Sequence, residues 1–219
     1  MEQKLKTLIV EDQRLGIDLL RGCLDDRFEV CASVQTMADG WKAFRKHDPD
    51  AAILDIELPD GSGLDLATRM LEASQKVKIL GVSAKTDEYT LYRIFVTGFF
   101  GFVDKNTESI DELRTAISHL AEGNCYYSAV VQQNNLLQRS DPKAFSQLLS
   151  EREQELMCHF GVGSSNETIA EKLNLRPVSV QNHRARIMKK LGVHSTVELI
   201  QYAIKIGFVH LTEFREAKQ

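Results

Sequence analysis

The sequence predicts a doubly wound α/β unit with a five-stranded parallel sheet in the first half of the chain and a small all-α unit in the second. In residues 1–123, short apolar runs alternate with amphipathic stretches, a pattern typical of buried strands and the helices that cover them. This alternation stops after Gly123, and from Leu149 onward every segment has helical periodicity. A chain of 219 residues has room for two such units.

Five strand–helix units are expected in the first half. Right-handed crossovers would place helices on both faces of the sheet. Met37, Trp41 and Phe44 fall at helical spacing and are expected to pack in the core. The expected strands are 8–10, 28–32, 51–54, 77–82 and 100–103, and the expected helices are 15–24, 37–46, 64–73, 87–96 and 110–121.

The stretch 124–147 is polar and contains a breaker at Pro142, which predicts a linker between domains at 1–123 and 148–219. Its middle, 130–137, could still form a short helix. Four short helices should follow it. Ser150 and Glu153 fit a capping box, and Pro177 suits a first helical position. Such a bundle would contain a helix-turn-helix.

The two halves differ in charge. Residues 1–123 hold 15 Lys or Arg against 22 Asp or Glu, whereas residues 124–219 hold 12 against 9. Separate partners are indicated, with nucleic acid a candidate for the second half. The four cysteines lack metal-type spacing and suggest reduced thiols in a reducing cytosol. No apolar run reaches about 18 residues, so no membrane span is expected, and we expect a cytoplasmic location.

Carboxylates follow two of the expected strands. Glu11 and Asp12 come after one apolar run, and Asp55 ends another before a Pro/Gly-rich loop. The carboxyl ends of parallel strands form the edge where such sheets bind ligands. Several carboxylates at one edge repel one another, and Mg²⁺ is the hard cation that oxygen ligands of this kind bind. Asp55 is therefore a candidate metal ligand or nucleophile.

Two further strand ends supply groups suited to phosphoryl chemistry. An aspartate can form an aspartyl phosphate, and the phosphoryl oxygens then need hydrogen-bond donors and positive charge. Ser83 follows the fourth strand, and Lys105 follows the fifth. Glu57 and Lys85 each lie two residues beyond a site residue, so we expect both at the mouth of the site, where they would set the lifetime of the phosphoryl group.

This constellation resembles the receiver domain of two-component response regulators, over residues 4–122. The resemblance implies a flavodoxin-like fold and phosphorylation of Asp55 by a sensor histidine kinase. It also implies a Mg²⁺ site made by Asp12, Glu11, Asp55 and the backbone carbonyl of Glu57. Ser83 and Lys105 would hold the phosphoryl group, and Phe102 would turn inward as the hydroxyl moves.

The second half carries a local basic cluster, and no acidic residue occurs between 172 and 190. Such a cluster suits phosphate contacts, although charge alone fits a solvated helix face equally well. The segments 149–153, 165–173, 178–183 and 189–193 resemble the DNA-binding domain of LuxR/FixJ (NarL) type regulators, over residues 148–208. The resemblance implies that the helix 177–190 enters the major groove of double-stranded DNA.

Gln181 and Asn182 lie near the start of that helix and are expected to contact bases. Gln181, Arg184 and Ala185 are expected on one side of it, with Ile187 and Leu191 toward the core. Arg176-Pro177 departs from the Ser/Thr cap and acid usual in the family, so site preference is not transferable. The remaining candidates form a pool of phosphate contacts: Ser179, His183, Arg184, Arg186, Lys189 and Lys190.

The chain is thus interpreted as a cytoplasmic bacterial response regulator, not an enzyme with a separate substrate, that dimerises when phosphorylated. One alternative is a Mg²⁺-dependent phosphohydrolase of haloacid-dehalogenase type, since Asp55-Ile56-Glu57 imitates its nucleophile motif. That class usually has Asp at the last position, and it leaves Glu11-Asp12 unexplained. A second alternative is an RNA-binding antiterminator on the same receiver, against which the helix-turn-helix pattern argues.

Overall fold

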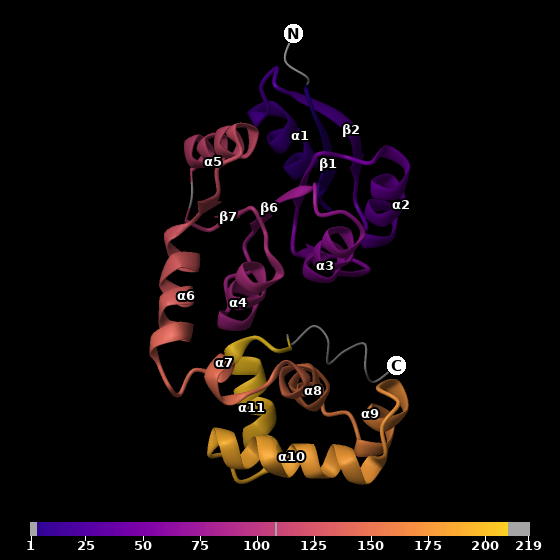
Figure 1. The fold of residues 1–219 in the computed structure, drawn as a ribbon, viewed down its shortest axis with the longest axis vertical. Helices are drawn as coiled ribbons and strands as arrows, with labels where there is room; N and C mark the ends of the chain where they lie inside the picture. The colour runs from indigo at the N-terminus through magenta and orange to yellow at the C-terminus, as the bar shows by residue number, and fades with distance from the viewer. Residues whose placement is uncertain (1–3, 108, 210–219) are drawn as a thin grey trace. The chain divides into compact units, whose positions relative to one another are not determined.

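The computed structural model describes residues 4–107 and 109–209. The chain divides into two compact units. One comprises Met1–Thr86 with Leu91–Gln133, and the other Asn134–Gln219 with Asp87–Thr90. The first is built around a parallel sheet and the second is helical (Figure 1). The predicted order, α/β and then all-α, is confirmed.

A six-stranded sheet in the order β2-β1-β3-β6-β7-β8 forms the centre of the first unit. All of its pairings are parallel. The expected count of five strands is wrong by one, because β8 adds an edge strand of two residues, too short to show any periodicity in the sequence. The strands are β1 (Leu5–Val10), β2 (Phe28–Val34), β3 (Ala51–Leu54), β6 (Lys78–Ser83), β7 (Gly101–Asp104) and β8 (Tyr126–Tyr127).

Helices cover both faces of this sheet. Leu20 of α1 and Leu113 of α5 pack with Val82 on one face. Phe44 of α2 and Met70 of α3 belong to the core of the other face, which α4 also covers. The helix bounds are α1 (Arg14–Cys23), α2 (Met37–His47), α3 (Gly63–Ala73), α4 (Glu88–Thr97) and α5 (Ile110–Glu122).

A short antiparallel hairpin, β4 (Glu57–Leu58) and β5 (Gly61–Ser62), forms the loop after β3 and was not expected from the sequence. Gly63 begins α3 directly after it. A Cβ at Gly63 would lie 2.0 Å from the backbone oxygen of Asp55, so only glycine allows the helix to start so close to that strand end.

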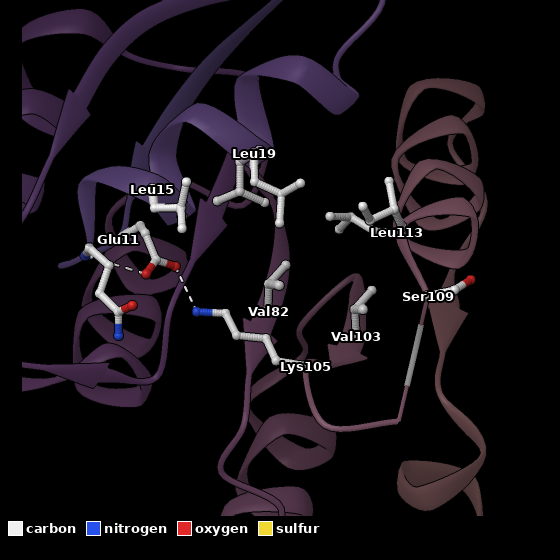
Figure 2. A pocket seen from close by; sticks show the side chains of 12 residues that line it. Glu11, Leu15, Leu19, Val82, Val103, Lys105, Ser109 and Leu113 are labelled. Atoms are coloured by element: carbon white, nitrogen blue, oxygen red, sulfur yellow. Dashed lines mark hydrogen bonds and ion pairs between the residues drawn. The ribbon is translucent and has the colours of Figure 1, made fainter.

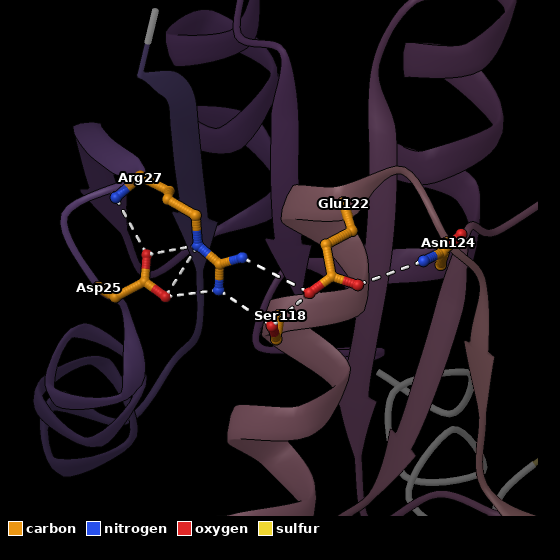
Figure 3. A network of polar contacts seen from close by, with 5 residues as sticks. All are labelled: Asp25, Arg27, Ser118, Glu122 and Asn124. Atoms are coloured by element: carbon orange, nitrogen blue, oxygen red, sulfur yellow. Dashed lines mark hydrogen bonds and ion pairs between the residues drawn. The ribbon is translucent and has the colours of Figure 1, made fainter. Parts of the chain in front are cut away.

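A polar network fixes the far end of α5 (Figure 3). The guanidinium of Arg27, just before β2, lies 2.6 Å from Asp25 and donates to Ser118 at 3.0 Å. Ser118 in turn donates to Glu122 at 2.9 Å, and Asn124 donates to the other oxygen of Glu122 at 3.3 Å. These exposed contacts add little stability singly. They anchor the last turn of α5 near the amino end of β2, which leaves its first turn toward the carboxyl edge of the sheet.

The stretch expected to be a linker, 124–147, has regular structure. It contains β8 and α6 (Ala129–Ser140), and the single turn α7 (Phe145–Leu148) begins within it. The short helix expected over 130–137 is found as the middle of α6. All four cysteines have free thiols. None of the described helices has the length and apolar composition needed to cross a membrane.

Four helices after this stretch correspond to the four expected. Ser150 and Glu153 form the predicted capping box. Gly192 adopts a left-handed conformation with a φ of 68° and ends the long helix. The bundle core includes the fully buried side chains of Leu156, Ile187 and Leu199. The helices are α8 (Glu151–Gly161), α9 (Asn166–Lys172), α10 (Pro177–Leu191) and α11 (Thr196–Ile206).

Candidate functional site

Three carboxylates converge at the carboxyl edge of the sheet. Strand β1 pairs with β3 so that Val10 lies opposite Leu54, and the next residues along each strand therefore come side by side. One carboxylate oxygen from each of Glu11, Asp12 and Asp55 lies within 4.8 Å of the other two. Glu11 and Asp55 are only 1% and 7% exposed, whereas Asp12 is half-buried.

Lys105 brings a positive charge to this cluster. Its Nζ lies 2.7 Å from Oε2 of Glu11 and 2.7 Å from Oδ2 of Asp55. Figure 2 shows the side chain extending from the end of β7 to Glu11. Burial would lower the pKa of Lys105, but its hydrogen bonds to the two carboxylates outweigh burial and raise the pKa. Burial raises the pKa of Glu11, and Lys105 only partly offsets this.

The Asp55 carboxylate is held at both oxygens. Oδ1 accepts a hydrogen bond from the backbone N–H of Glu57 at 3.1 Å, and Oδ2 accepts from Lys105 at 2.7 Å. The backbone N–H of Asp55 donates to the carbonyl of Val10 at 2.8 Å. The side chain is therefore positioned by groups on three segments before any ligand arrives.

Ser83 and Phe102 lie on the same face of the sheet. In the register of β6 and β7, Gly81 is opposite Phe102 and Ser83 is opposite Asp104, which places the two side chains on adjacent strands two positions apart. Both residues are fully buried. The ring of Phe102 fills space over Gly81, where a Cβ would be 2.9 Å from a ring carbon. The hydroxyl of Ser83 accepts a hydrogen bond from the backbone N–H of Lys85 at 3.3 Å.

Glu57 and Lys85 differ in their surroundings. The Glu57 side chain is exposed and that of Lys85 is half-buried. Within residues 4–107 and 109–209, no ion pair within 4.0 Å joins the two. The two side chains are therefore not paired with each other.

The carboxylate cluster fits a small oxygen-binding cation. Mg²⁺ binds oxygen at about 2.1 Å in octahedral geometry, which places ligand oxygens about 3–4 Å apart. The oxygens of Glu11, Asp12 and Asp55 lie within 4.8 Å of one another, so a small inward movement brings them to that spacing. Carboxylate oxygens are also the chemistry that this cation prefers.

A cavity of about 300 Å³ adjoins the cluster on the α1–α5 side (Figure 2). Glu11 and Lys105 border it, and its other walls are largely apolar. Leu15 and Ile110, on the first turns of α1 and α5, are 81% and 50% exposed beside it. This surface is not evident from the sequence, because both leucine and isoleucine fit the core pattern of their helices.

The exposed face of α10 carries the two amides. Val178, Gln181, Asn182, Ala185 and Lys189 are all exposed and follow helical spacing, opposite the buried Val180 and Ile187. Val178 is 58% exposed, an unusual position for an apolar residue within a polar stripe. Val178 was not among the residues expected to contact DNA, although it lies three and four residues before the two amides in the sequence.

Arg184 lies elsewhere than the sequence suggested. It was expected beside Gln181, but it is half-buried, its guanidinium donates to the carbonyl of Ser164 at 3.3 Å, and it stacks 4.4 Å above the Phe160 ring. Burial lowers its pKa. The expectation for its side is wrong because Phe160 offers an aromatic partner that the helical pattern alone does not reveal.

Lys190 is held by an acid of α8. Its Nζ lies 2.5 Å from Oε2 of Glu153, whose side chain is 4% exposed. His183 and Ser179 are half-buried, whereas Arg186 and Lys189 are exposed. Of the predicted phosphate contacts, Arg186 and Lys189 are therefore the best placed to reach a ligand on the exposed face.

Family comparisons match both units. Residues 7–118 match the response regulator receiver domain, and residues 147–203 match the bacterial regulatory proteins of the luxR family. This combination leaves no support for the phosphohydrolase and antiterminator alternatives.

Curated relatives resemble the chain over nearly its whole length. The oxygen regulatory protein NreC of Staphylococcus carnosus is 32% identical over 216 residues, which cover 92% of this chain and 97% of the relative. The nitrate/nitrite response regulator protein homolog of Haemophilus influenzae is 32% identical over 200 residues, covering 90% of this chain and 95% of the relative.

Solved structures share the fold. The RcsB response regulator of Salmonella typhimurium superposes with a TM-score of 0.65 at 21% identity, over 93% of this chain and 98% of that one. A structure of RcsB from Salmonella enterica serovar Typhimurium, bound to a promoter in the presence of the phosphomimetic BeF₃⁻, gives 0.63 at 20% identity, over 91% and 98%.

Three observations point to one class of protein. Two family matches follow one another along the chain, relatives are more than 30% identical over nearly its full length, and carboxylates cluster at the strand ends. The chain belongs to the response regulators with a receiver domain and a LuxR-type DNA-binding domain, and is a phosphorylation-controlled regulator of transcription in a two-component system.

Proposed function

We propose that Asp55 is the phosphoacceptor. A carboxylate oxygen of Asp55 would attack the phosphorus of the donor, and the new O–P bond would form as the bond from phosphorus to the donor nitrogen or oxygen breaks. The observation that carries this proposal is the position of Asp55, buried between Glu11 and Lys105 with both of its oxygens already hydrogen-bonded.

Mg²⁺ would supply positive charge to the phosphoryl oxygens during this transfer. The residues that would hold it are Asp12, Glu11 and Asp55, with the backbone carbonyl of Glu57. Lys105 carries the compensating charge at Glu11 and Asp55. It is well placed to remain beside the oxygens of the new phosphoryl group.

Ser83, Lys105 and Phe102 would convert phosphorylation into a change of conformation. The hydroxyl of Ser83 and the ammonium of Lys105 would bind phosphoryl oxygens, and the ring of Phe102 would follow the hydroxyl into the space it leaves. Two observations support this role. Ser83 and Phe102 lie on the same face of the sheet. The ring of Phe102 also lacks a hydroxyl that burial would leave without a hydrogen bond. Ligands and modifications act by shifting such an equilibrium.

Glu57 and Lys85 would set the lifetime of the phosphoryl group. The exposed carboxylate of Glu57 follows Asp55 by two residues, and the backbone of Lys85 is hydrogen-bonded to Ser83. Since the two side chains are not paired, they would act independently, and variants at each should change the dephosphorylation rate separately.

The exposed face of α10 would contact double-stranded DNA. The amides of Gln181 and Asn182 would pair with base edges, and Arg186 and Lys189 would contact phosphates. Ser179 and His183 could contribute from the margin of the same face. Arg184 and Lys190 would instead position the helix through Phe160 and Glu153.

The partners that follow are a sensor histidine kinase, a DNA duplex and a second copy of the phosphorylated chain. The chain would work in the bacterial cytoplasm, where its DNA target lies, and its only turnover would be of its own phosphoryl group. The working boundaries would be 1–123 for the receiver, 124–147 for the connecting segment and 148–219 for the DNA-binding domain.

The phosphoacceptor is tested by labelling the full chain with acetyl phosphate and Mg²⁺. Intact-mass measurement should show one added phosphoryl group on the wild type and none on Asp55→Asn, while Asp60→Asn, a control in the same loop, is labelled normally. Full labelling of Asp55→Asn would reject the assignment.

The DNA-reading face is tested by selecting sites from a random duplex pool. Gln181→Ala and Asn182→Ala should each relax preference at particular base pairs, each amide being worth about 1–3 kcal/mol of discrimination. Lys189→Ala should weaken all sequences alike and reduce the salt slope by about one. A motif identical for the wild type and both amide variants would show that these amides do not read bases.

A further inference from the structure

A second cavity lies on the opposite flank of the receiver, between α2 and α3. Its volume is about 480 Å³, within the range of about 300–1,000 Å³ usual for small-molecule sites. It has a mixed lining of aromatic, basic and sulfur-containing side chains. These residues are Met37, Ala38, Trp41, Lys42, Asp65, Leu66 and Arg69.

Trp41 organises the positive charge at this cavity. The guanidinium carbon of Arg69 lies 3.9 Å from the centroid of its ring, and that of Arg45 lies 5.9 Å away. Both arginines are exposed. Among the residues that the structure describes, neither has a carboxylate within 4.0 Å. An arginine held against an aromatic ring keeps its N–H donors available, and its planar fork matches the oxygens of phosphate.

The acids nearby do not cancel this charge. Asp39 lies 3.0 Å from Lys42, and Asp65 lies 3.6 Å from Arg93, so each already has a cationic neighbour. The charges of Arg45 and Arg69 remain uncompensated. Lys46, one turn after Lys42 on α2, adds a further exposed cation. This positive surface contrasts with the net negative charge of residues 1–123, which hold 15 basic and 22 acidic residues.

The side chains that line the cavity are suited to one class of ligand. Aromatic and guanidinium planes stack with nucleobases, and Arg and Lys bind phosphate. Met37 offers a polarisable thioether that packs against ring edges. We propose that the cavity between α2 and α3 binds a nucleoside phosphate, with the phosphate at Arg69 and the base against Met37 and the edge of Trp41, whose ring already contacts Arg69 and stacks on Phe44.

The cavity also contacts the loop that follows Asp55. The backbone N–H groups of Met37 and Ala38 donate to the carboxylate of Asp60 at 2.6 and 2.9 Å. The Met37 sulfur packs over Gly61, where a Cβ would meet it at 2.8 Å. A ligand that moves Met37 therefore acts on the hairpin whose first residue, Glu57, hydrogen-bonds Asp55. The coupling between the ligand and Asp55, unlike the binding itself, rests on the proposed role of Asp55. Thermodynamic linkage makes this coupling reciprocal, so a change at Asp55 should alter the affinity for the ligand.

Binding is tested with AMP, GMP, ADP and GDP on the full chain without Mg²⁺. Trp41 is the single tryptophan in the chain, so its fluorescence reports directly on the cavity, and calorimetry provides an independent isotherm. At least one nucleotide should saturate below 1 mM and bind at least tenfold more tightly than ribose 5-phosphate or inorganic phosphate. Arg69→Gln should weaken it at least tenfold, Arg69→Lys less, and Arg14→Gln, at an exposed arginine of α1, should leave it unchanged.

Absence of saturable binding, or equal affinity in Arg69→Gln, would overturn the site. Equal affinity for inorganic phosphate would show an anion contact without base recognition and would overturn the ligand class. Binding should survive in Asp55→Asn, which separates this proposal from the fate of the phosphoacceptor. In the wild type, BeF₃⁻ with Mg²⁺ should change nucleotide affinity at least threefold, and no change would refute the coupling.

Discussion

The ammonium nitrogen of Lys105 lies 2.7 Å from Oδ2 of Asp55, although 50 residues separate them in the chain. The contact joins the end of β7 to the end of β3, with the end of β6 between them in the sheet order. The same nitrogen also lies 2.7 Å from Glu11. One cation therefore compensates two buried carboxylates, and it competes with any other cation for them.

Removal of Lys105 should tighten Mg²⁺ binding. Lys105→Ala deletes a positive charge within a few ångströms of the carboxylates, so we expect affinity to rise about tenfold, or about 1.4 kcal/mol. Calorimetric titration of Mg²⁺ measures this. Lys76→Ala, at an exposed lysine before the amino end of β6 without a carboxylate contact among the described residues, is the control and should change affinity less than threefold. Equal affinities for wild type and Lys105→Ala would place the metal elsewhere.

Ser83→Ala should separate phosphorylation from response. The hydroxyl is buried beside Phe102, and its loss leaves Asp55 and its carboxylate neighbours in place. Acetyl phosphate should still label the variant, but phosphorylation should raise DNA affinity far less than in the wild type. Ser33→Ala removes a hydroxyl near the end of β2 that bonds Arg21, and it should respond normally. A full response in Ser83→Ala would remove this hydroxyl from the switch.

Lys190 and Lys189 are neighbours with different expected roles. Lys190→Met leaves the buried Glu153 carboxylate without its cation and should lower the free energy of unfolding of the helical unit by about 1–3 kcal/mol. Lys189→Met should leave stability unchanged and weaken DNA binding. Urea unfolding and DNA titration of both variants measure these effects. The reverse pattern would make Lys190 the phosphate contact.

The same ion pair predicts a pH dependence. Burial would raise the pKa of Glu153, but hydrogen bonds from Lys190 and Ser150 outweigh it and hold the pKa below its usual 4.5. A lowered pKa means that the stabilisation is complete above pH 4.5 and is lost as the pH falls through the lower native value. Wild type should therefore lose more stability than Lys190→Met between pH 6 and pH 3. Parallel curves for the two proteins would contradict the sign.

Val178 is expected to contact a thymine methyl group. It is 58% exposed at the start of α10, beside the two amides. Burying one methyl is worth about 0.8 kcal/mol, roughly fourfold in affinity. Replacing a single thymine by uracil in the selected site should weaken wild-type binding by about this factor and leave Val178→Ala unaffected. If no thymine position shows a difference, Val178 does not read the methyl group.

The strand-end carboxylates were predictable because parallel strands bring their carboxyl ends to one edge, so Asp55, Glu11 and Lys105 could be placed together without knowing a contact. The two-residue strands β4, β5 and β8 were not predictable, since they have no length over which periodicity can appear. Arg184 was assigned to the wrong side because its partner, Phe160, lies 24 residues earlier and only folding brings them together. Trp41 was expected in the core and is half-buried there, but the contact of Arg69 with its ring depends on the approach of α3 to α2.

The central claim is that phosphorylation of Asp55 controls DNA binding by the second unit. The direct measurement is the affinity of the full chain for a selected duplex, with and without BeF₃⁻ and Mg²⁺, for wild type and Asp55→Asn at one salt concentration. BeF₃⁻ should raise the affinity of the wild type at least tenfold and leave the affinity of Asp55→Asn unchanged. An equal response in both proteins, or no response to BeF₃⁻ in a wild type that acetyl phosphate labels on Asp55, would contradict this control of DNA binding.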